Sequence, residues 1–522
     1  MLASWLRCAV LTAGLLASVP LASATRSMGR PSNVNKTVSD VDTATHFTTK
    51  HVTKRASTGK VSMSYYPNWA IYSALNFPPT EIDASKLSHI IYSFADASAS
   101  DGTVVLTDSW ADEQIHYDGD SWSDTGNNLY GCLKRMYLLK MANRSLKVLL
   151  SVGGWTYTNT DHHFDSITSS TWRANFVSSA VQLVKDYGFD GIDIDYEYPS
   201  TAAQGQGFAD LLTELRTAFT SLQTSNGDSV PYQITVAVAA GLDNAANYVV
   251  PQMDKAIDYW NLMAYDYSGS FSTVTANQAN VYGDQLTGFS TDKALTWYKA
   301  QGATASKIVL GMPAYGHSFE GTTGLGSTFT TTVSTGTIDV GIFAYKQLPL
   351  AGSTVFENTT DISSYSYDAS KKEFISYDTP AIVKLKAQYA QAKGLAGSMF
   401  WDLATDTTGS DSLMAASASV YGALDTTQNH LSYPASKWDN IRNNMGQTTT
   451  TPTTTSAPAA SSTASTGSGS GSCASVAAWS SSAVYTAGMT ATYSGSLWTA
   501  SWWTQGDTPG GSAGVWVKTS AC

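Results

Sequence analysis

Three acidic residues at alternate positions form the strongest chemical signal in the sequence. Residues 190–199 read Asp-Gly-Ile-Asp-Ile-Asp-Tyr-Glu-Tyr-Pro. Side chains alternate along a β-strand, so Asp193, Asp195 and Glu197 lie on one face and apolar residues on the other. Crowded carboxylates repel one another, so at least one should have a raised pKa and hold a proton near neutral pH. A carboxylic acid beside a carboxylate suits general acid catalysis at a glycosidic oxygen.

A solvated acidic edge or a metal site could also explain this run. The alternation with isoleucine disfavours a solvated face, and no second acidic cluster has the spacing of Mg²⁺ or Ca²⁺ ligands. His162-His163 lacks a zinc-binding spacing and is read as a polar loop. The only Gly-Lys pair in the sequence, Gly59-Lys60, is followed by Val61 and not by Ser or Thr, which rules out a P-loop. We therefore expect no metal and no cofactor.

The elements that position these acids alternate between strand and helix. Eight such alternations predict an α/β protein with a (β/α)8 barrel, in which the three acids point inward and climb toward the C-terminal rim. An open doubly wound sheet is the alternative, but no glycine-rich fingerprint follows the first strand. The predicted strands are Val61–Tyr66, His89–Phe94, Val148–Val152, Gly191–Tyr196, Gln233–Ala239, Tyr259–Met263, Ile308–Met312 and Gly397–Trp401. The predicted helices include Trp172–Tyr187, Phe208–Thr224 and Ala381–Gly394.

The gap before the last strand is too long for a simple helical connection. Between Pro313 and Gly397 lie 83 residues, and the part before the last helix is rich in Thr, Gly and Tyr. A structureless loop of this length is uncommon in a compact domain. We expect a small β-rich insertion at about 318–375, between barrel strands seven and eight.

The two ends of the chain differ in composition from the body at 56–446. Arg7 precedes an apolar run, and small residues at 22–24 suit a signal peptidase, so 1–24 is a predicted signal peptide. The polar stretch 25–55 ends in Lys54-Arg55 and is a predicted propeptide. Residues 447–472 are almost entirely Thr, Ser, Pro, Ala and Gly, a composition that predicts an extended linker before a small all-β module at 473–522. The mature protein is expected to be secreted.

Charge and cysteine content fit this expectation. The 522 residues include 41 acidic and 30 basic ones, a formal charge of −11, so neither nucleic acid nor a membrane is an expected partner, and we expect a monomer. Cys473 and Cys522 bracket the tail and should form a disulfide, whereas Cys132 should be a buried structural thiol. Two sequons, at Asn143 and Asn358, could carry glycans.

The acidic run resembles the DxxDxDxE signature of glycoside hydrolase family 18. Further motifs follow in the order of that family and cover about residues 62–446, most closely as in secreted fungal chitinases with an α+β insertion. They are Tyr65–Trp69, the SxGG-like Ser151–Trp155, the MxYD-like Met263–Asp266, Gly311–Gly316, and Gly397–Trp401 at strand eight.

The resemblance implies a mechanism in which the 2-acetamido group of the substrate attacks the anomeric carbon. By similarity, Glu197 protonates the glycosidic oxygen and then activates water, while Asp195 polarises the acetamido group. Asp193 would share a proton with Asp195, Asp190 would give structural support, and Tyr265 would hydrogen-bond the acetamido oxygen. Further substrate contacts are implied at Asp266, Trp401, Trp155, Trp69, Tyr66 and Met263. Two departures, Tyr196 where many relatives carry Trp and His317 where close relatives often carry Arg, leave the subsite preferences open.

The tail resembles chitin-binding modules of carbohydrate-binding families 5 and 12. It contains five of the 15 tryptophans, and a 50-residue module has too little interior to bury them all. Exposed coplanar rings stack on a polysaccharide face. The resemblance implies that Trp502 and Trp503, or one of them with Tyr485, form this pair.

Three function classes remain open at this point. A chitinase acting on chitin and chitooligosaccharides is favoured over a silent chitin-binding lectin, because silent relatives typically lose the acid at the position of Glu197. An endo-β-N-acetylglucosaminidase acting on N-glycans is the third class, and the chitin-binding tail counts against it. Sugar release from colloidal chitin, compared with glycan release from a glycoprotein, separates the three.

Overall fold

The computed structural model describes two parts of the chain. They are residues 59–446, except 73, 332–335 and 337, and residues 476–521, except 482, 486–488, 501–503 and 512–513. They form two compact units, one within Met1–Thr448 and one within Thr449–Cys522. The predicted signal peptide, propeptide, linker, Cys473–Cys522 disulfide, Trp502 and Trp503 lie outside the described residues.

A closed barrel of parallel strands forms the first unit. The strand order is β1-β14-β8-β7-β6-β5-β4-β2, and β2 pairs with β1 to close the ring. The predicted (β/α)8 barrel is thus confirmed, and its strand bounds differ from the predicted ones by only a few residues. The barrel strands are β1 (Val61–Pro67), β2 (His89–Ala97), β4 (Lys147–Gly153), β5 (Gly191–Asp195), β6 (Gln233–Ala239), β7 (Tyr259–Met263), β8 (Ile308–Pro313) and β14 (Gly397–Trp401), with β3 (Val104–Leu106) antiparallel to β2.

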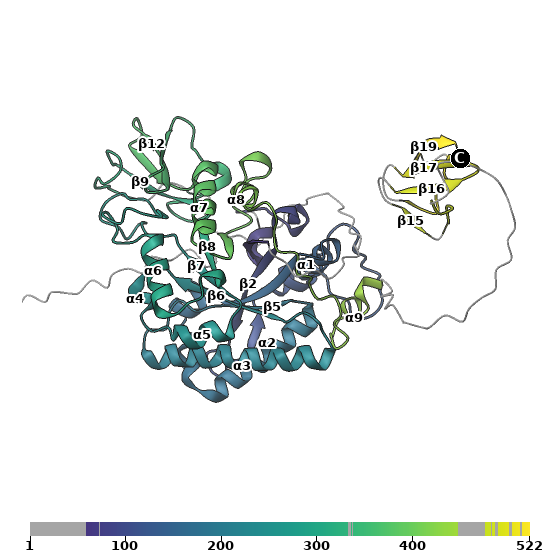
Figure 1. Ribbon diagram of the computed structural model, residues 1–522, viewed down its shortest axis with the longest axis horizontal. Helices are drawn as coiled ribbons and strands as arrows, with labels where there is room; N and C mark the ends of the chain where they lie inside the picture. The colour runs from purple at the N-terminus through teal and green to yellow at the C-terminus, as the bar shows by residue number, and fades with distance from the viewer. Residues whose placement is uncertain are drawn as a thin grey trace, which may run out of the picture. The chain divides into compact units, whose positions relative to one another are not determined.

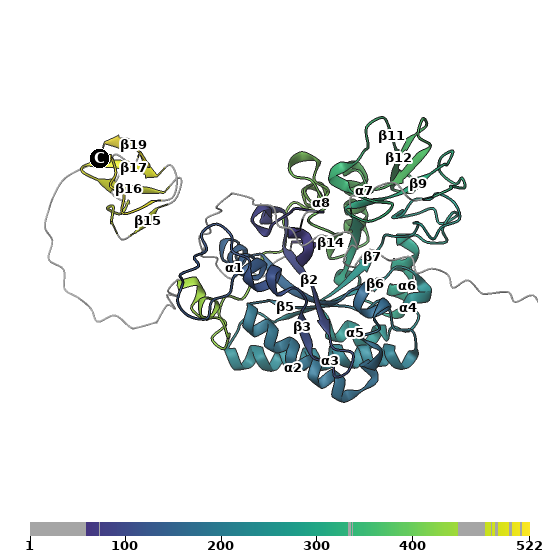
Figure 2. The same ribbon diagram turned by 180° about the vertical axis from the view of Figure 1, so that it is seen from behind.

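Helices cover the outside of the barrel, and in Figures 1 and 2 α2, α3 and α5 lie together beneath β5 and β6. They are α1 (Gly131–Ala142), α2 (Ser170–Tyr187), α3 (Ala202–Asn226), α4 (Leu242–Ala245), α5 (Val250–Ala256), α6 (Thr291–Gln301), α7 (Pro380–Ala392), α8 (Leu413–Tyr421) and α9 (Asp439–Arg442). Within the described residues, no helix combines the length and apolar character needed to cross a bilayer.

Helix α3 begins six residues earlier than the sequence pattern predicts. Thr201 caps its start by accepting a hydrogen bond from the backbone of Gln204. The first turns contain Gly205 and Gly207, which weaken a helical prediction because glycine has low helix propensity. A Cβ at Gly205 would lie 1.8 Å from the carbonyl oxygen of Asn247, so the glycine is needed for close packing.

The insertion predicted between barrel strands seven and eight is a five-stranded antiparallel sheet. Its strand order is β10-β9-β13-β12-β11. Figures 1 and 2 both show this sheet beside α7, at one side of the barrel. It starts at Tyr315, directly after β8, because β9 continues the chain from that barrel strand. The strands are β9 (Tyr315–Glu320), β10 (Ile342–Ala344), β11 (Thr354–Asn358), β12 (Ser363–Asp368) and β13 (Glu373–Ser376).

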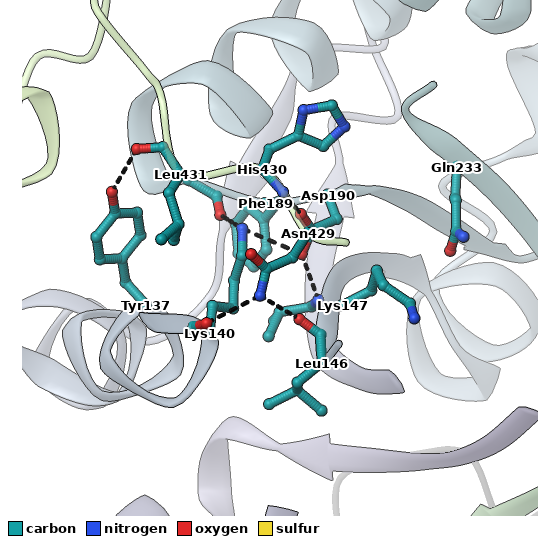
Figure 3. Close-up of polar contacts among 12 residues, drawn as sticks. Tyr137, Lys140, Leu146, Lys147, Phe189, Asp190, Gln233, Asn429, His430 and Leu431 are labelled. Carbon is teal, nitrogen blue, oxygen red and sulfur yellow. Dashed lines mark hydrogen bonds and ion pairs between the residues drawn. The ribbon is translucent and has the colours of Figure 1, made fainter. Parts of the chain in front are cut away.

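A polar cluster joins the start of β5 to the segment that follows α8 (Figure 3). The buried Lys140 ammonium lies 3.0 Å from an Asp190 carboxylate oxygen. Asp190 also accepts hydrogen bonds from the backbone N–H groups of Val148 and His430. The amide of Asn429 donates to three backbone carbonyls, those of Lys140, Asn143 and Leu146. These mostly buried contacts tie the C-terminal segment to the barrel, and a buried partner left unpaired would be costly.

The second unit is a small all-β structure. Strands β16 (Thr490–Tyr493), β17 (Ser496–Ala500) and β19 (Trp516–Ala521) form an antiparallel sheet, and β15 (Val484–Tyr485) pairs with β18 (Thr504–Gln505). Tyr485 and Trp516 meet edge to face, with ring centroids 4.7 Å apart, in the core of this unit. Tyr485 is therefore buried, which corrects the expectation that it is an exposed stacking ring.

Candidate active site

The three carboxylates at the end of β5 have very different surroundings. Asp193 is fully buried and accepts hydrogen bonds from four strands. The donors are Tyr65 Oη on β1, Ser151 Oγ on β4, Thr235 Oγ1 on β6 and Asn261 Nδ2 on β7. Burial raises the pKa of Asp193, and these hydrogen bonds act in the opposite direction.

Asp195 is equally buried, but both of its carboxylate oxygens lack a hydrogen-bond partner among the described residues. Burial, followed by the charges of Glu197 and Asp193, raises its pKa well above the ordinary value. The chain passes very close to its backbone, since a Cβ at Gly153 would lie 2.2 Å from the Asp195 carbonyl oxygen. Gly153 also has φ +112°, a conformation that side chains rarely adopt. The backbone of Asp195 is therefore closely packed, while its carboxylate keeps unused acceptor capacity.

Glu197 follows β5 and is also fully buried. Its carboxylate accepts a hydrogen bond of 2.9 Å from Tyr198 Oη, and its backbone N–H donates to Thr158 Oγ1. Burial raises the pKa of Glu197 to about 8, and the negative charge of Asp266 adds to the rise. Glu197 therefore carries a proton at neutral pH, as a general acid must.

Tyr265 and Asp266 follow β7 and are both buried. Tyr265 Oη lies 3.9 Å from the Met399 sulfur, and burial raises the pKa of this phenol well above its ordinary value, so it remains a hydrogen-bond donor. Asp266 Oδ1 accepts hydrogen bonds from Tyr315 Oη and from His317 Nε2, at 2.5 and 2.9 Å.

Aromatic rings pack together at the ends of the neighbouring strands. Trp401, the last residue of β14, stacks on Phe94 at 5.8 Å and meets Tyr65 edge to face at 5.5 Å. Trp69 lies 6.3 Å from Trp401 and is itself buried. Trp155, after β4, is only partly buried. The Tyr65 ring therefore links this aromatic group to Asp193.

Known protein families match both parts of the chain. The family model described as Glycosyl hydrolases family 18 matches residues 61–406. The chain belongs to glycosyl hydrolase family 18. A second model, described as Carbohydrate-binding module family 5/12, matches residues 478–517 of this family 18 protein.

Relatives of the family 18 protein include fungal enzymes. It is 46% identical to endochitinase 1 of Metarhizium robertsii over 398 residues, which cover 76% of this chain and 93% of the relative. Chitinase 1 of Aphanocladium album is 44% identical over 76% of this chain and 93% of its own. The catalytic domain of chitinase B from Arthrobacter TAD20 superposes with a TM-score of 0.64 at 26% identity, covering 71% of this chain and 98% of that domain.

In this family 18 protein, one predicted site residue faces away from the acids. Tyr66 stacks on Tyr92 and donates its hydroxyl to the Phe77 carbonyl, whereas Tyr65 points to Asp193. The correction follows from the alternation along β1: only one of two consecutive tyrosines can face the barrel interior. Met263, the last residue of β7, is fully buried.

Sequence reasoning missed several polar partners of the acids. Asn261 is a polar residue inside an otherwise apolar predicted strand, a signal that could have placed it in the barrel interior. Tyr198 directly follows Glu197 in the sequence, and this position could have suggested a contact with the acid. Thr235 offers no comparable signal, because threonine is common in strands on either face.

The remaining predicted residues lie away from the acids. Cys132 is a free, buried thiol whose pKa is raised to about 12 by burial. Asn143 is partly buried at the end of α1, and Asn358 is exposed at the end of β11. Within the described residues, no group of three or more His, Cys, Asp or Glu side chains is arranged to hold a metal ion.

Proposed function

We propose that this family 18 chitinase is secreted and hydrolyses the β-1,4 linkages between N-acetylglucosamine units of chitin by substrate-assisted, retaining catalysis. The observation that carries the proposal is Asp195, whose two buried oxygens have no hydrogen-bond partner among the described residues. Buried polar atoms are normally paired, so an unpaired carboxyl group between two other acids needs an explanation. An acetamido N–H of a bound sugar would supply the missing partner.

Glu197 starts the reaction as general acid. Its proton passes to the glycosidic oxygen while the acetamido carbonyl oxygen forms a bond to the anomeric carbon, and the bond to the leaving sugar breaks. The product of this step is a positively charged oxazolinium ion. Glu197, now a carboxylate, then takes a proton from water, and the water oxygen bonds to the anomeric carbon. The bond between the acetamido oxygen and the anomeric carbon breaks, which opens the oxazolinium ring and restores the acetamido group. Two inversions at one carbon leave the product in the β configuration.

Asp195 and Tyr265 stabilise the charged intermediate. Asp195 shares a proton with Asp193, whose four hydrogen bonds favour its ionised form. As positive charge develops on the acetamido group, the proton moves toward Asp193 and leaves Asp195 negative beside the N–H. The Tyr265 hydroxyl donates to the acetamido oxygen. In a buried pocket, such preorganised groups act more strongly than in water.

The aromatic group bears the sugar in the reacting subsite. Trp401 forms its floor, with the buried Trp69 packed beside it, and the partly buried Trp155 offers a ring face to an adjacent sugar. The carbohydrate-binding module would hold the enzyme on solid chitin through Trp502 and Trp503. Residues 1–24 would direct secretion and 25–55 would be removed at Lys54-Arg55. Linker 447–472 would tether the module, and Asn143 and Asn358 would carry glycans.

The test combines substrate range with product stereochemistry. Soluble sugar should be released from colloidal chitin, and fresh product should be the β anomer by NMR. Substrates without the N-acetyl group on the reacting sugar should be nearly inert. An α-anomeric product, or equal rates on a de-acetylated sugar, would rule out substrate assistance even if chitin is cleaved.

A further inference from the structure

We propose that Thr158 and Asn159 are positioning residues for Glu197: their side chains hold the backbone of the acid beyond the end of its strand. The inference rests on the proposed function, because it assigns a role within the same site. It adds the loop that follows β4, residues 154–163, to the parts of the chain that the reaction requires.

The backbone of Glu197 lies beyond the regular hydrogen bonding of the barrel. Strand β5 ends at Asp195, and the pairing of β4 with β5 ends with Gly153 opposite Asp195. Glu197 is fully buried, so its backbone N–H and C=O groups need partners from another part of the chain. An acid whose backbone could shift would not keep a fixed distance to the glycosidic oxygen. The loop after β4 supplies the partners.

Two neighbouring side chains of this loop bond to both backbone groups of Glu197. The N–H of Glu197 donates to Thr158 Oγ1 at 3.1 Å, and Asn159 Nδ2 donates to the Glu197 carbonyl oxygen at 3.2 Å. Thr158 Oγ1 also lies 3.5 Å from this carbonyl oxygen, but its hydroxyl has a closer acceptor in the carbonyl of Gly154, at 2.9 Å. Thr158 therefore accepts from Glu197 while it donates to Gly154.

These contacts close a hydrogen-bonded ring between the loop and the end of β5. The N–H of Gly154 donates to the Asp195 carbonyl at 2.8 Å, while the carbonyl of Gly154 accepts from the Thr158 hydroxyl. The ring therefore includes the backbones of Asp195 and Glu197 and fixes both relative to the loop. Thr158 is itself buried, and a Cβ at Gly153 would lie 3.0 Å from its methyl group, so the glycine leaves room for this side chain.

The loop is also fastened at its far end. His163 Nδ1 lies 2.8 Å from Asp96 Oδ2 near the end of β2, and the backbone N–H of His163 donates to the Tyr157 carbonyl at 2.9 Å. The rings of Tyr157 and His163 stack with their centroids 6.0 Å apart. Because the loop is held by both β4 and β2, it can impose a fixed position on Glu197. Trp155 belongs to the same loop, so one segment places the acid and a ring proposed to contact a sugar.

The effect of a displaced acid depends on how much the leaving group needs a proton. A sugar hydroxyl is a poor leaving group and must be protonated as it departs, whereas the phenolate of methylumbelliferyl chitobioside leaves with little help. A displaced Glu197 should therefore slow the cleavage of a bond between two sugars far more than the cleavage of this aryl glycoside. A general loss of folded enzyme would lower both rates alike.

Substitutions in the full-length enzyme separate these two cases through kcat/KM for chitotetraose and for the aryl glycoside. Thr158→Val keeps the shape of the side chain but removes the hydroxyl. It should lower kcat/KM about 30-fold or more for chitotetraose and by no more than about threefold for the aryl glycoside. Thr158→Ser restores the hydroxyl and should stay within about threefold of wild type on both substrates.

A second variant and a control complete the set. Asn159→Ala, at a partly exposed position, should lower kcat/KM for chitotetraose about tenfold and leave that for the aryl glycoside nearly unchanged, and it carries the test if Thr158→Val does not fold. Thr213→Val is the matched control, because it removes a hydroxyl that donates to the Ala209 carbonyl on the outer helix α3. It should behave as wild type on both substrates.

Two further measurements address the link to Glu197 directly. In the Glu197→Gln background, Thr158→Val should cause no additional loss on chitotetraose, because no acid is left to position. In the enzyme that retains Glu197, the amide of this residue should exchange with deuterium about tenfold faster or more in Thr158→Val, measured by mass spectrometry, and at the wild-type rate in Thr213→Val.

Equal losses on both substrates in Thr158→Val, an additional loss in the Glu197→Gln background, or unchanged exchange of the Glu197 amide would overturn the proposal. If the wild type cleaved neither substrate, the proposed function would fail. The exchange rates would still show in that case whether Thr158 holds the backbone of Glu197.

Discussion

Asp193 and Asp195 lie two residues apart on β5, yet Asp193 accepts four hydrogen bonds while Asp195 accepts none from any described residue. Both side chains are fully buried. The donors around Asp193 stabilise its charged form, whereas nothing comparable stabilises a charge on Asp195. Asp193 is thus the more easily ionised of the two carboxyl groups, as the proposed proton sharing requires. Ile194, the one residue between them on β5, points to the opposite face, so both carboxyl groups lie on the same face.

Replacement of Glu197 by Gln should abolish hydrolysis and spare binding. Gln keeps the size and hydrogen-bonding reach of Glu197 but cannot donate the proton. We expect kcat/KM to fall by a factor on the order of 10³ or more, with chitooligosaccharide affinity retained in isothermal titration calorimetry. A modest loss of activity together with a large loss of affinity would assign Glu197 to binding instead.

The pH profile should have an alkaline limit set by Glu197. Because its pKa is raised to about 8, the acid holds its proton at neutral pH and loses it as the pH rises through this value. We expect kcat/KM on a soluble oligosaccharide to decline above about pH 8. The limit belongs to the coupled acids as a group. A flat profile up to pH 10 would contradict the assignment.

Asp195→Asn should reduce the rate of hydrolysis severely, because the acetamido group would lose the carboxylate that balances its positive charge. We expect kcat to fall by about 10²-fold or more, with the fold unchanged by circular dichroism. The exposed Asp118→Asn is the matched control and should keep wild-type activity. Added azide should not rescue Asp195→Asn as a glycosyl azide, since no protein nucleophile is replaced.

The cluster around Lys140 predicts a stability effect without a catalytic one. Asp190→Asn leaves the buried Lys140 ammonium without its counter-charge and should lower the free energy of unfolding by about 3–5 kcal/mol. The double variant Lys140→Met/Asp190→Asn should recover part of this loss, because it removes the unpaired charge. Asp284→Asn breaks an exposed pair with Lys293 and should cost less than about 1 kcal/mol. Urea denaturation measures the free energy of unfolding of all three variants. Equal losses in Asp190→Asn and Asp284→Asn would refute the role assigned to burial.

Deletion of residues 447–522 should reduce activity on solid substrate alone. A flexible tether makes the second binding event effectively intramolecular and raises the enzyme concentration on a chitin surface. Activity on insoluble chitin should fall severalfold, while rates on soluble oligosaccharides should stay near those of the full chain. Equal losses on both substrates would argue against a modular enzyme.

Local pattern determined much of this protein from sequence alone. The period-two alternation of acid and apolar residues at 190–197 placed three carboxylates on one face, and the recurrence of strand and helix patterns predicted the barrel and its insertion. These features depend on residues that are close together in the chain, so they can be predicted from composition and spacing. The helix start at Ala202 was missed because two glycines hide a turn that tertiary packing requires.

Contacts between distant segments were decided only by the tertiary structure. The sequence cannot choose whether Tyr65 or Tyr66 faces the acids, because both suit a strand and the phase is set by barrel closure. It could not bring His317 to Asp266, which lies 51 residues earlier in the chain. The burial of Tyr485 likewise depends on its pairing with Trp516 across the small module. The register and closure of the sheets determine which side chains meet, and this information is not contained in any local stretch of the chain.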